Sequence, residues 1–363
     1  MSTLITVNLD ALEANYRYCR DQLQPASCAA VVKADAYGLG INRIAPALWH
    51  AGCRQFFTAT FREGITLRAL LPDADVFVLE GVTEVSLDAF CEHRLVPVLI
   101  SPAHSALWSG QARMHGRPLP AIIHIDTGMT RLGFGEPELF ELLQGSDDLE
   151  WLDTRYVMTH YACADDSGVD ITRRQLEQFD KLRKLLPPAP TSVGNSAGGL
   201  LGKPYSGDMA RIGIALFGGN PYLDEMPPLE TVLRVQSRVL QLRQIGPGTT
   251  VGYGATHTVD SNTMIATVGT GYADGYPWSL GNRGVASVGG HRVPVVGRVS
   301  MDLITLDVTG VPADLVQPGR MVDLIGPDIS LEEVAERAGT VNYEILTRLS
   351  ERARRKFVGG PES

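Results

Sequence analysis

Residues 28–40 read CAAVVKADAYGLG, and they set the interpretation of the whole chain. The apolar run Ala29–Val32 predicts a buried strand that spans Cys28–Lys33. The small residues and glycines that follow predict a loop. Lys33 is the only lysine in the first 180 residues of a chain that has five lysines among its 32 basic residues. A lone amine directly after a buried strand needs a physical reason to be there.

Similar runs recur along the first two thirds of the chain, most of them separated by helical patterns. Eight strands separated by helices or loops predict a (β/α)8 barrel, with a doubly wound sheet as the alternative. The expected strands are Cys28–Lys33, Gln55–Thr60, Val76–Glu80, Val96–Ile100, Ala121–Asp126, Arg155–His160, Thr191–Gly194 and Arg211–Phe217.

Two helices illustrate the pattern. The first should be capped by Asp10, with Glu13 completing a capping box, because apolar residues recur on one face after it. The second should span about Asp170–Leu186, where Leu176, Phe179 and Leu182 form a stripe.

The pattern changes after about residue 226, where alternating Val, Thr and Gly replace helical spacing. This predicts a mostly antiparallel β-domain over residues 227–363, preceded by a barrel over residues 1–226 and joined to it by a proline-rich linker near 220–228. One short helix should interrupt the β-domain, capped by Ser330 and Glu333 and ended by Gly339. The expected strands are Thr231–Gln244, Thr263–Thr270, Val285–Val296, Asp302–Val308 and Met321–Ile325.

Composition excludes several classes of protein. The 363 residues carry a net charge of −9, which argues against a general binder of nucleic acid or of anionic membranes. Five cysteines without a CxxC pair favour neither a disulfide framework nor a zinc site, so we expect no metal. The N-terminus lacks the features of a signal peptide, and no apolar stretch reaches about 18 residues. We therefore expect a cytoplasmic protein.

Lys33 is the first candidate for chemistry. In a barrel of this type the C-terminal ends of the strands form the active site. A lysine that is partly desolvated there becomes nucleophilic and suits a Schiff base with a carbonyl substrate or with pyridoxal phosphate. The alternative is a structural lysine that extends to solvent or pairs with Asp35.

Other expected strand ends add polar groups. Arg131 follows the fifth strand and His160 ends the sixth. Residues 194–199 form a small-residue loop in which Ser196 and backbone amides can hold a phosphate. Arg211 is the only charge in the apolar eighth run. A lysine, a phosphate loop, and an arginine and a histidine at separate strand ends point together to one active site.

The motifs that contain these residues resemble alanine racemases, and they occur in that family's order. They read VVKADAYGLG (31–40), IDTGMTRLGF (125–134), MTHYACAD (158–165), NSAG (195–198), RIGIALFGG (211–219), VGYGATHT (251–258), GYADGYP (271–277), VGRVSMDLITLDV (296–308) and NYEIL (342–346). The resemblance implies an isomerase (EC 5.1.1.1) with a pyridoxal-phosphate-binding barrel, a β-domain, and a homodimer whose active sites use both chains.

The resemblance also implies residue roles. Lys33 would bond the cofactor and act as one catalytic base, and Tyr253 from the partner chain would act as the other. His160 and Arg211 would tune Tyr253 and the cofactor ring. The remaining assignments are Tyr37, Ser196, Gly213, Ile214 and Tyr343 around the cofactor phosphate, and Arg131, Met301 and Tyr272 toward the substrate.

The implied reaction interconverts L- and D-alanine by two-base proton transfer on a pyridoxal phosphate aldimine, and it would supply D-alanine for peptidoglycan. Two bases on opposite faces serve the two directions. A tyrosine has an ordinary pKa near 10, so a neighbouring His–Arg pair is needed to lower it. An arginine against the ring nitrogen keeps that nitrogen unprotonated, because arginine does not give up its own proton.

Two positions depart from the family pattern. His124 stands where a modified lysine often holds Arg131, so His124 or an anion must take over that role. Trp278 stands in place of an expected arginine. The alternatives are a racemase of broader or serine specificity, a decarboxylase on the same barrel, and a non-catalytic pyridoxal phosphate carrier.

Overall fold

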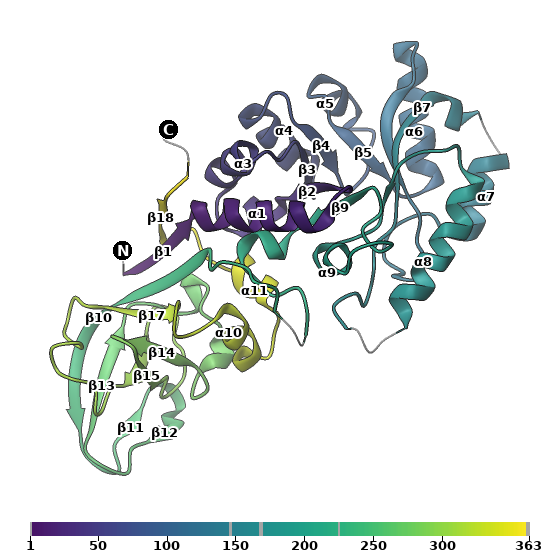
Figure 1. Ribbon diagram of the computed structural model, residues 1–363. Coiled ribbons are helices and arrows are strands. Elements are labelled where there is room, and N and C mark those ends of the chain that lie inside the picture. Colours follow the sequence, from purple (N-terminus) through teal and green to yellow (C-terminus); the bar gives the residue numbers. More distant parts are fainter. Residues whose placement is uncertain (1, 145–146, 167–169, 224–225, 361–363) are drawn as a thin grey trace.

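The computed structural model describes residues 2–144, 147–166, 170–223 and 226–360. Figure 1 shows a barrel surrounded by helices and, beside it, a domain made mostly of strands. The prediction of a (β/α)8 barrel followed by a mostly antiparallel β-domain is therefore confirmed.

Eight parallel strands form the barrel in the order β8-β7-β6-β5-β4-β3-β2-β9. Strands β2 and β9 pair from Ser27–Met209 onward, so the first and last strands meet and the doubly wound alternative is wrong. The N–H of Arg211 donates to the Gly194 carbonyl at 2.8 Å and nearly closes the barrel. The strands β2 to β9 are Ser27–Val31, Gln55–Thr58, Asp75–Val78, Val96–Leu99, Leu119–His124, Leu152–Met158, Thr191–Ser192 and Met209–Ile212.

Helices and one short turn surround these strands. They are α1 (Leu9–Leu23), the turn α2 (Lys33–Tyr37), α3 (Ile41–His50), α4 (Phe61–Leu70), α5 (Leu87–Glu92), α6 (Pro102–His115), α7 (Glu136–Gln144), α8 (Ile171–Leu182) and α9 (Ser196–Leu200). Helix α8 confirms the predicted apolar stripe, but it ends at Leu182 and continues as a 3₁₀ turn over Arg183–Leu185.

The eighth strand is shorter than predicted. Strand β9 ends at Ile212, and Ile214–Phe217 form a 3₁₀ turn instead of extended chain. Gly213 leaves the strand conformation with φ −119° and ψ −92°, which turns the backbone across the end of the barrel. An apolar run cannot by itself distinguish a strand from a buried turn.

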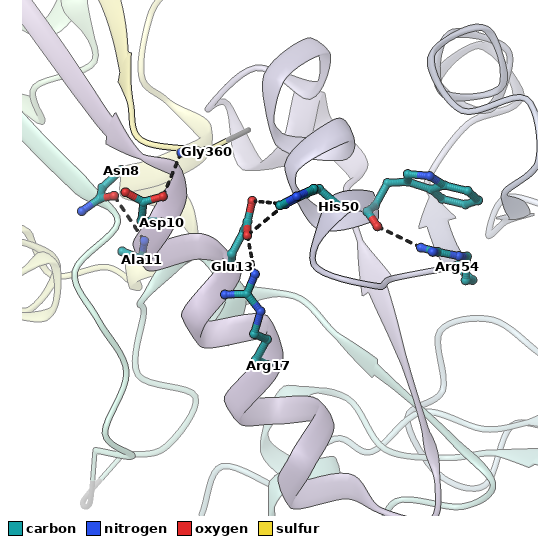
Figure 2. A network of polar contacts seen from close by, with 9 residues as sticks. Asn8, Asp10, Ala11, Glu13, Arg17, His50, Arg54 and Gly360 are labelled. Atoms are coloured by element: carbon teal, nitrogen blue, oxygen red, sulfur yellow. Dashed lines mark hydrogen bonds and ion pairs between the residues drawn. The ribbon is translucent and has the colours of Figure 1, made fainter. Parts of the chain in front are cut away.

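The predicted cap of the first helix is also wrong. Asn8, not Asp10, caps α1, because its side chain accepts the N–H of Ala11 at 3.2 Å. Asp10 instead accepts the N–H of Gly360, and so anchors the end of the described chain (Figure 2). Glu13 is buried and binds Arg17 and His50, which joins α1 to α3.

The second sheet has the order β15-β14-β17-β10-β1-β18, with β13 pairing to β10 and β16 pairing to β13. Strand β1 comes from the N-terminus and lies between β10 and β18, as the purple, green and yellow ribbons of Figure 1 show. Neither β1 nor β18 is predicted from the sequence. The strands are β1 (Thr3–Asn8), β10 (Leu233–Ile245), β13 (Thr263–Val268), β14 (Val285–Val288), β15 (His291–Pro294), β16 (Ile304–Asp307), β17 (Met321–Ile325) and β18 (Arg354–Val358), with a separate hairpin of β11 (Thr250–Val251) and β12 (His257–Thr258).

Two helices of the second domain face the barrel's end. Helix α10 (Leu331–Ala338) is capped by Ser330 and ended by Gly339 in the left-handed region, as predicted. The side chain of Glu333 does not complete a capping box, because it binds Arg292 and Arg337. Helix α11 (Asn342–Thr347) follows. These helices bring residues of the second domain to the mouth of the barrel.

Candidate active site

A cavity of about 1230 Å³ lies at the C-terminal ends of the barrel strands, with α10 and α11 forming part of its wall. It brings together nine of the twelve predicted site residues, which come from both domains of the same chain. These are Lys33, Tyr37, Arg131, His160, Ser196, Arg211, Gly213, Ile214 and Tyr343.

Lys33 lies two residues beyond the end of β2 and lines the cavity. Burial lowers the pKa of its amine, and the positive charge of Arg131 lowers it further. Asp35 is not among the charges that act on this amine, and one of its carboxylate oxygens accepts the N–H of Ile41 at 2.7 Å. Lys33 is therefore a partly desolvated amine that loses its proton more readily than an exposed lysine does.

Arg211 is fully buried on β9 and is held by oxygen atoms. Its guanidinium donates to the carbonyl and hydroxyl of Ser192, each at 2.8 Å, and to the carbonyl of Thr159 at 2.8 Å. Burial lowers the pKa of Arg211 to about 10, so it remains a cation at neutral pH. The cation is fixed in place by backbone acceptors of the neighbouring strand ends.

Arg211 also sets the state of His160. Its Nη2 lies 3.2 Å from His160 Nδ1. Because arginine only donates, Nδ1 must accept, and the proton of the neutral ring lies on Nε2. Burial and the charge of Arg211 hold the pKa of His160 well below its ordinary value. The imidazole is therefore neutral and presents a donor from Nε2.

His124 lines the same cavity at the end of β6. Burial, together with the charges of Arg211 and Arg131, lowers its pKa to about 3. Two neutral imidazoles and three cationic side chains thus line one cavity. Five carboxylates, those of Glu80, Asp165, Glu332, Glu336 and Glu344, also line it, so an anionic ligand would depend on the cations at the strand ends and not on the net charge of the cavity.

The ends of β8 and β9 form a cradle for an anion. The N–H of Gly213 donates to Ser196 Oγ at 2.9 Å, and a Cβ atom on Gly213 would lie only 2.2 Å from Tyr37 Oη. Burial raises the pKa of Tyr343 to about 12 and raises that of Tyr37 as well. Both hydroxyls therefore stay protonated and available as donors. The amides that begin α9 and the turn at Ile214 add further donors, because the first N–H groups of a helix have no partner within it.

Three predicted residues lie elsewhere. Tyr253, Tyr272 and Met301 do not line the cavity of their own chain, and Tyr253 is 74 % exposed. All three belong to the β-domain. The N–H of Tyr272 donates to the Ser300 carbonyl at 3.1 Å, which places Tyr272 beside Met301. Arg298 lies between the Tyr253 turn and the ring of Trp278, with its guanidinium 5.9 Å from the ring centre.

Several residues around the cavity were missed by the sequence reading. Glu63 of α4 accepts the N–H of Ala34, next to Lys33, at 2.8 Å. Glu332 accepts the N–H of Asn220 at 2.8 Å and joins α10 to the barrel at the cavity mouth. The capping-box spacing of Thr60 and Glu63 was visible in the sequence, but no pattern indicated the contact between Glu332 and Asn220.

Two features are absent from residues 2–144, 147–166, 170–223 and 226–360. No helix there is both long and apolar enough to cross a membrane. No three His, Cys, Asp or Glu side chains in the same ranges are arranged to hold a metal ion.

Comparisons with known proteins cover nearly the whole chain. Residues 7–221 match the family model of the alanine racemase N-terminal domain, and residues 232–357 match that of the C-terminal domain. The chain is 46% identical over 360 residues to an alanine racemase of Rhodospirillum rubrum, covering 99% of this chain and 96% of the relative. It is 42% identical to a catabolic alanine racemase of Rhizobium johnstonii, covering 97% and 94%.

Solved structures agree. An alanine racemase from Bartonella henselae with covalently bound pyridoxal phosphate has a TM-score of 0.95 and 36% identity, covering 99% of this chain and all of that one. A biosynthetic alanine racemase from Pseudomonas aeruginosa has a TM-score of 0.91 and 32% identity, covering 99% of both chains. Both domains, their order and their fold match, and the chain belongs to the alanine racemase family.

Proposed function

We propose that this protein interconverts L- and D-alanine with pyridoxal phosphate bound in the cavity, and that Lys33 and Tyr253 are the two bases. The observation that carries the proposal is the partly desolvated Lys33, which shares a cavity at the C-terminal ends of the barrel strands with Arg131 and Arg211. Membership of the alanine racemase family supports the reaction.

The cavity residues fit the cofactor. Ser196, Gly213 and the amide of Ile214 would hold the phosphate, with Tyr37 and Tyr343 as hydroxyl donors. A side chain at Gly213 would occupy the space against Tyr37, so the glycine keeps the cradle open. Lys33 would bond the cofactor covalently. When bound, pyridoxal phosphate withdraws electrons from the amino acid and makes its α-proton acidic.

Lys33 would hold or release the proton on one face of the substrate. Its lowered pKa favours the neutral amine, which can accept a proton. Arg131, at the same cavity wall, would bind the substrate carboxylate. Met301 and Tyr272 would complete the substrate side from the β-domain of the partner subunit.

Tyr253 of the partner subunit would serve the opposite face. The Nε2–H of His160 is the donor that would face its hydroxyl oxygen, and a hydrogen bond to a phenolate lowers the pKa of a tyrosine. Arg211 holds His160 in the required tautomer through Nδ1. Because Arg211 stays charged and only donates, it would also leave the cofactor ring nitrogen unprotonated.

A homodimer would explain why these residues lie outside their own cavity. An exposed apolar surface covers one part of the β-domain, and surfaces of this kind mark interaction sites. Its members are Tyr253, Tyr272, Trp278, Met301 and Leu303. In a two-fold dimer each copy can present this surface to the cavity of the other, which gives two equivalent shared sites.

Two alternatives from the sequence lose support. A decarboxylase is expected to place a carboxylate against the ring nitrogen, whereas the side chain that β9 brings to the cavity is the cation Arg211, held by Ser192 and Thr159. A non-catalytic carrier would resemble the barrel alone, but the match to the C-terminal domain extends over residues 232–357. We further propose a cytoplasmic enzyme that supplies D-alanine for peptidoglycan, with domains at 1–226 and 227–363 and β1 completing the second sheet.

Exchange in deuterated water tests the proposal. Incubation with L-alanine should incorporate deuterium at the α-carbon and yield D-alanine, as followed by NMR and chiral chromatography. L-serine in a parallel sample tests the broader-specificity alternative. Deuteration without loss of chirality, or turnover of serine in preference to alanine, would contradict the assignment.

A further inference from the structure

The backbone directly after Lys33 has an unusual conformation. Ala34, Asp35, Ala36 and Tyr37 all have positive φ values between 53° and 57°, so the turn is left-handed over four residues, none of them glycine. This conformation is unfavourable for residues with a side chain, because Cβ approaches the following carbonyl oxygen. Tertiary contacts must therefore hold the turn that carries Lys33.

The two ends of this turn are held by different residues. At the far end, Asp35 accepts the N–H of Ile41, and Arg355 donates to the carbonyl of Gly38 at 2.7 Å. At the Lys33 end, Oε1 of Glu63 accepts the N–H of Ala34 at 2.8 Å. Glu63 is thus the side chain that fixes the peptide group next to the lysine.

The other oxygen of Glu63 binds a different strand end. Its Oε2 accepts the N–H of Ala59 at 2.8 Å and that of Thr60 at 3.3 Å. Ala59 follows β3, and Lys33 follows β2, so one carboxylate ties the ends of two adjacent barrel strands. The helix cap alone needs only the contact to Thr60.

Glu63 also contributes charge near the amine. Burial and Arg131 lower the pKa of Lys33, while the negative charge of Glu63 opposes them. His160, from the end of β7, faces the same amine but is held neutral. Glu63 is therefore the anion that balances the cationic surroundings of Lys33.

We propose that Glu63 is a positioning residue for Lys33, because its carboxylate fixes the turn that carries the lysine and places a negative charge beside its amine. The inference rests on the proposed function in so far as Lys33 is the reactive lysine. Its structural part, the control of Lys33 by Glu63, is independent of that function and is measured separately.

The five lysines of the chain make a direct test possible. Full-length protein freed of cofactor by hydroxylamine is labelled with acetic anhydride over a range of pH, and the acetylation of each lysine is measured by peptide mass spectrometry. Glu63→Gln keeps the size of the side chain and removes its charge. The midpoint of the acetylation-versus-pH curve of Lys33 should fall by roughly one pH unit, because a nearby opposite charge is lost. Lys181, paired to Glu136 on the outside of the barrel, should not change.

Glu138→Gln is the matched control. Glu138 accepts the N–H of Gly135 at 2.7 Å before α7, so it also caps a helix with a carboxylate, but it does not bind the Lys33 turn. This variant should leave the midpoint of Lys33 unchanged. An unchanged midpoint in Glu63→Gln, or an equal shift in Glu138→Gln, would overturn the proposal.

Activity of the loaded enzyme gives the second readout. The side chain of Gln has one oxygen instead of two, so in Glu63→Gln only one of the two strand ends can keep its hydrogen-bond acceptor. Lys33 is then displaced, and kcat should fall about tenfold to a hundredfold with little change in KM. Glu63→Asp keeps the charge but is too short to reach both strand ends. It should retain the midpoint of Lys33 more closely than Glu63→Gln and still lose kcat, and unaltered kcat in both variants would overturn the positioning role.

The outcomes separate the two proposals. If the cofactor is found on another lysine, the proposed function fails, yet a shifted Lys33 midpoint in Glu63→Gln still supports the control of this turn by Glu63. If the cofactor is on Lys33 and the midpoint does not move, only the inference about Glu63 fails.

Discussion

Mixing two inactive variants tests whether each active site is built from two chains. Lys33→Ala removes the residue that lines its own cavity, and Tyr253→Phe removes a hydroxyl that lies outside it. Each variant alone should be inactive, because every site of its homodimer lacks one base. In a mixed dimer, one site has lost both residues and the other combines an intact Lys33 with an intact Tyr253.

The stoichiometry gives the size of the effect. If protomers exchange freely from an equal mixture, about half of the dimers are mixed and each has one intact site of two, so about a quarter of the unaltered activity should return. Protomers are exchanged by dilution and reconcentration of the mixture, and D-alanine formation from L-alanine is then measured with a coupled oxidase assay. Activity should appear only after exchange.

A second mixture is the control. Arg131 lines the same cavity as Lys33 of its own chain, so Lys33→Ala mixed with Arg131→Ala leaves no site intact in any dimer. That mixture should stay inactive. Failure of Lys33→Ala and Tyr253→Phe to restore activity, or equal recovery in the control, would refute the shared site.

Three further predictions concern single residues. Gly213→Ala should weaken cofactor binding, measured by fluorescence titration, because its Cβ would lie 2.2 Å from Tyr37 Oη. Gly110→Ala in α6 is the control: no atom lies within 4 Å of its Cβ, so this variant should stabilise the fold by about 0.5–1 kcal/mol. Arg211→Ala should lower the free energy of unfolding in urea by roughly 3 kcal/mol, since buried carbonyl oxygens lose their donor, and a loss below about 1 kcal/mol would contradict this. The pKa of His124 is about 3 when folded and about 6.5 when unfolded, so its contribution to stability is present above pH 6.5 and is lost as pH falls toward 3. Between pH 7 and pH 5, the free energy of unfolding of the unaltered protein should therefore fall by about 2 kcal/mol more than that of His124→Gln. An equal fall in both proteins would contradict a neutral buried imidazole.

Local patterns predicted the barrel well because each strand and helix carries its own apolar spacing. Eight strands and the cap at Ser330 follow from neighbouring residues, whereas the run predicted as one strand, Val285–Val296, is a hairpin of β14 and β15. Strand β1 could not be predicted in the same way, because its partners β10 and β18 lie more than 200 residues away. The cap at Asn8 was missed since Asp10, an equally good capping residue, binds Gly360 instead.

The site was predictable to the extent that strand ends meet in a barrel. Lys33, His160 and Arg211 followed from that rule, and the cavity contains all three. Tyr253, by contrast, was identified only through family resemblance, because an aromatic residue between glycines has no distinctive spacing. The contact of Glu63 with Ala34 could not be predicted because it joins helix α4 to the turn α2, and the two residues lie 29 positions apart in the sequence.

Borohydride reduction tests the central claim most directly. Reduction of the purified holoenzyme should fix the cofactor to the protein, and peptide mass spectrometry then identifies the modified lysine among the five present. The account predicts that the cofactor is found on the peptide that contains Lys33 and on no other. A cofactor on the peptide of Lys181, Lys184, Lys203 or Lys356 would contradict it.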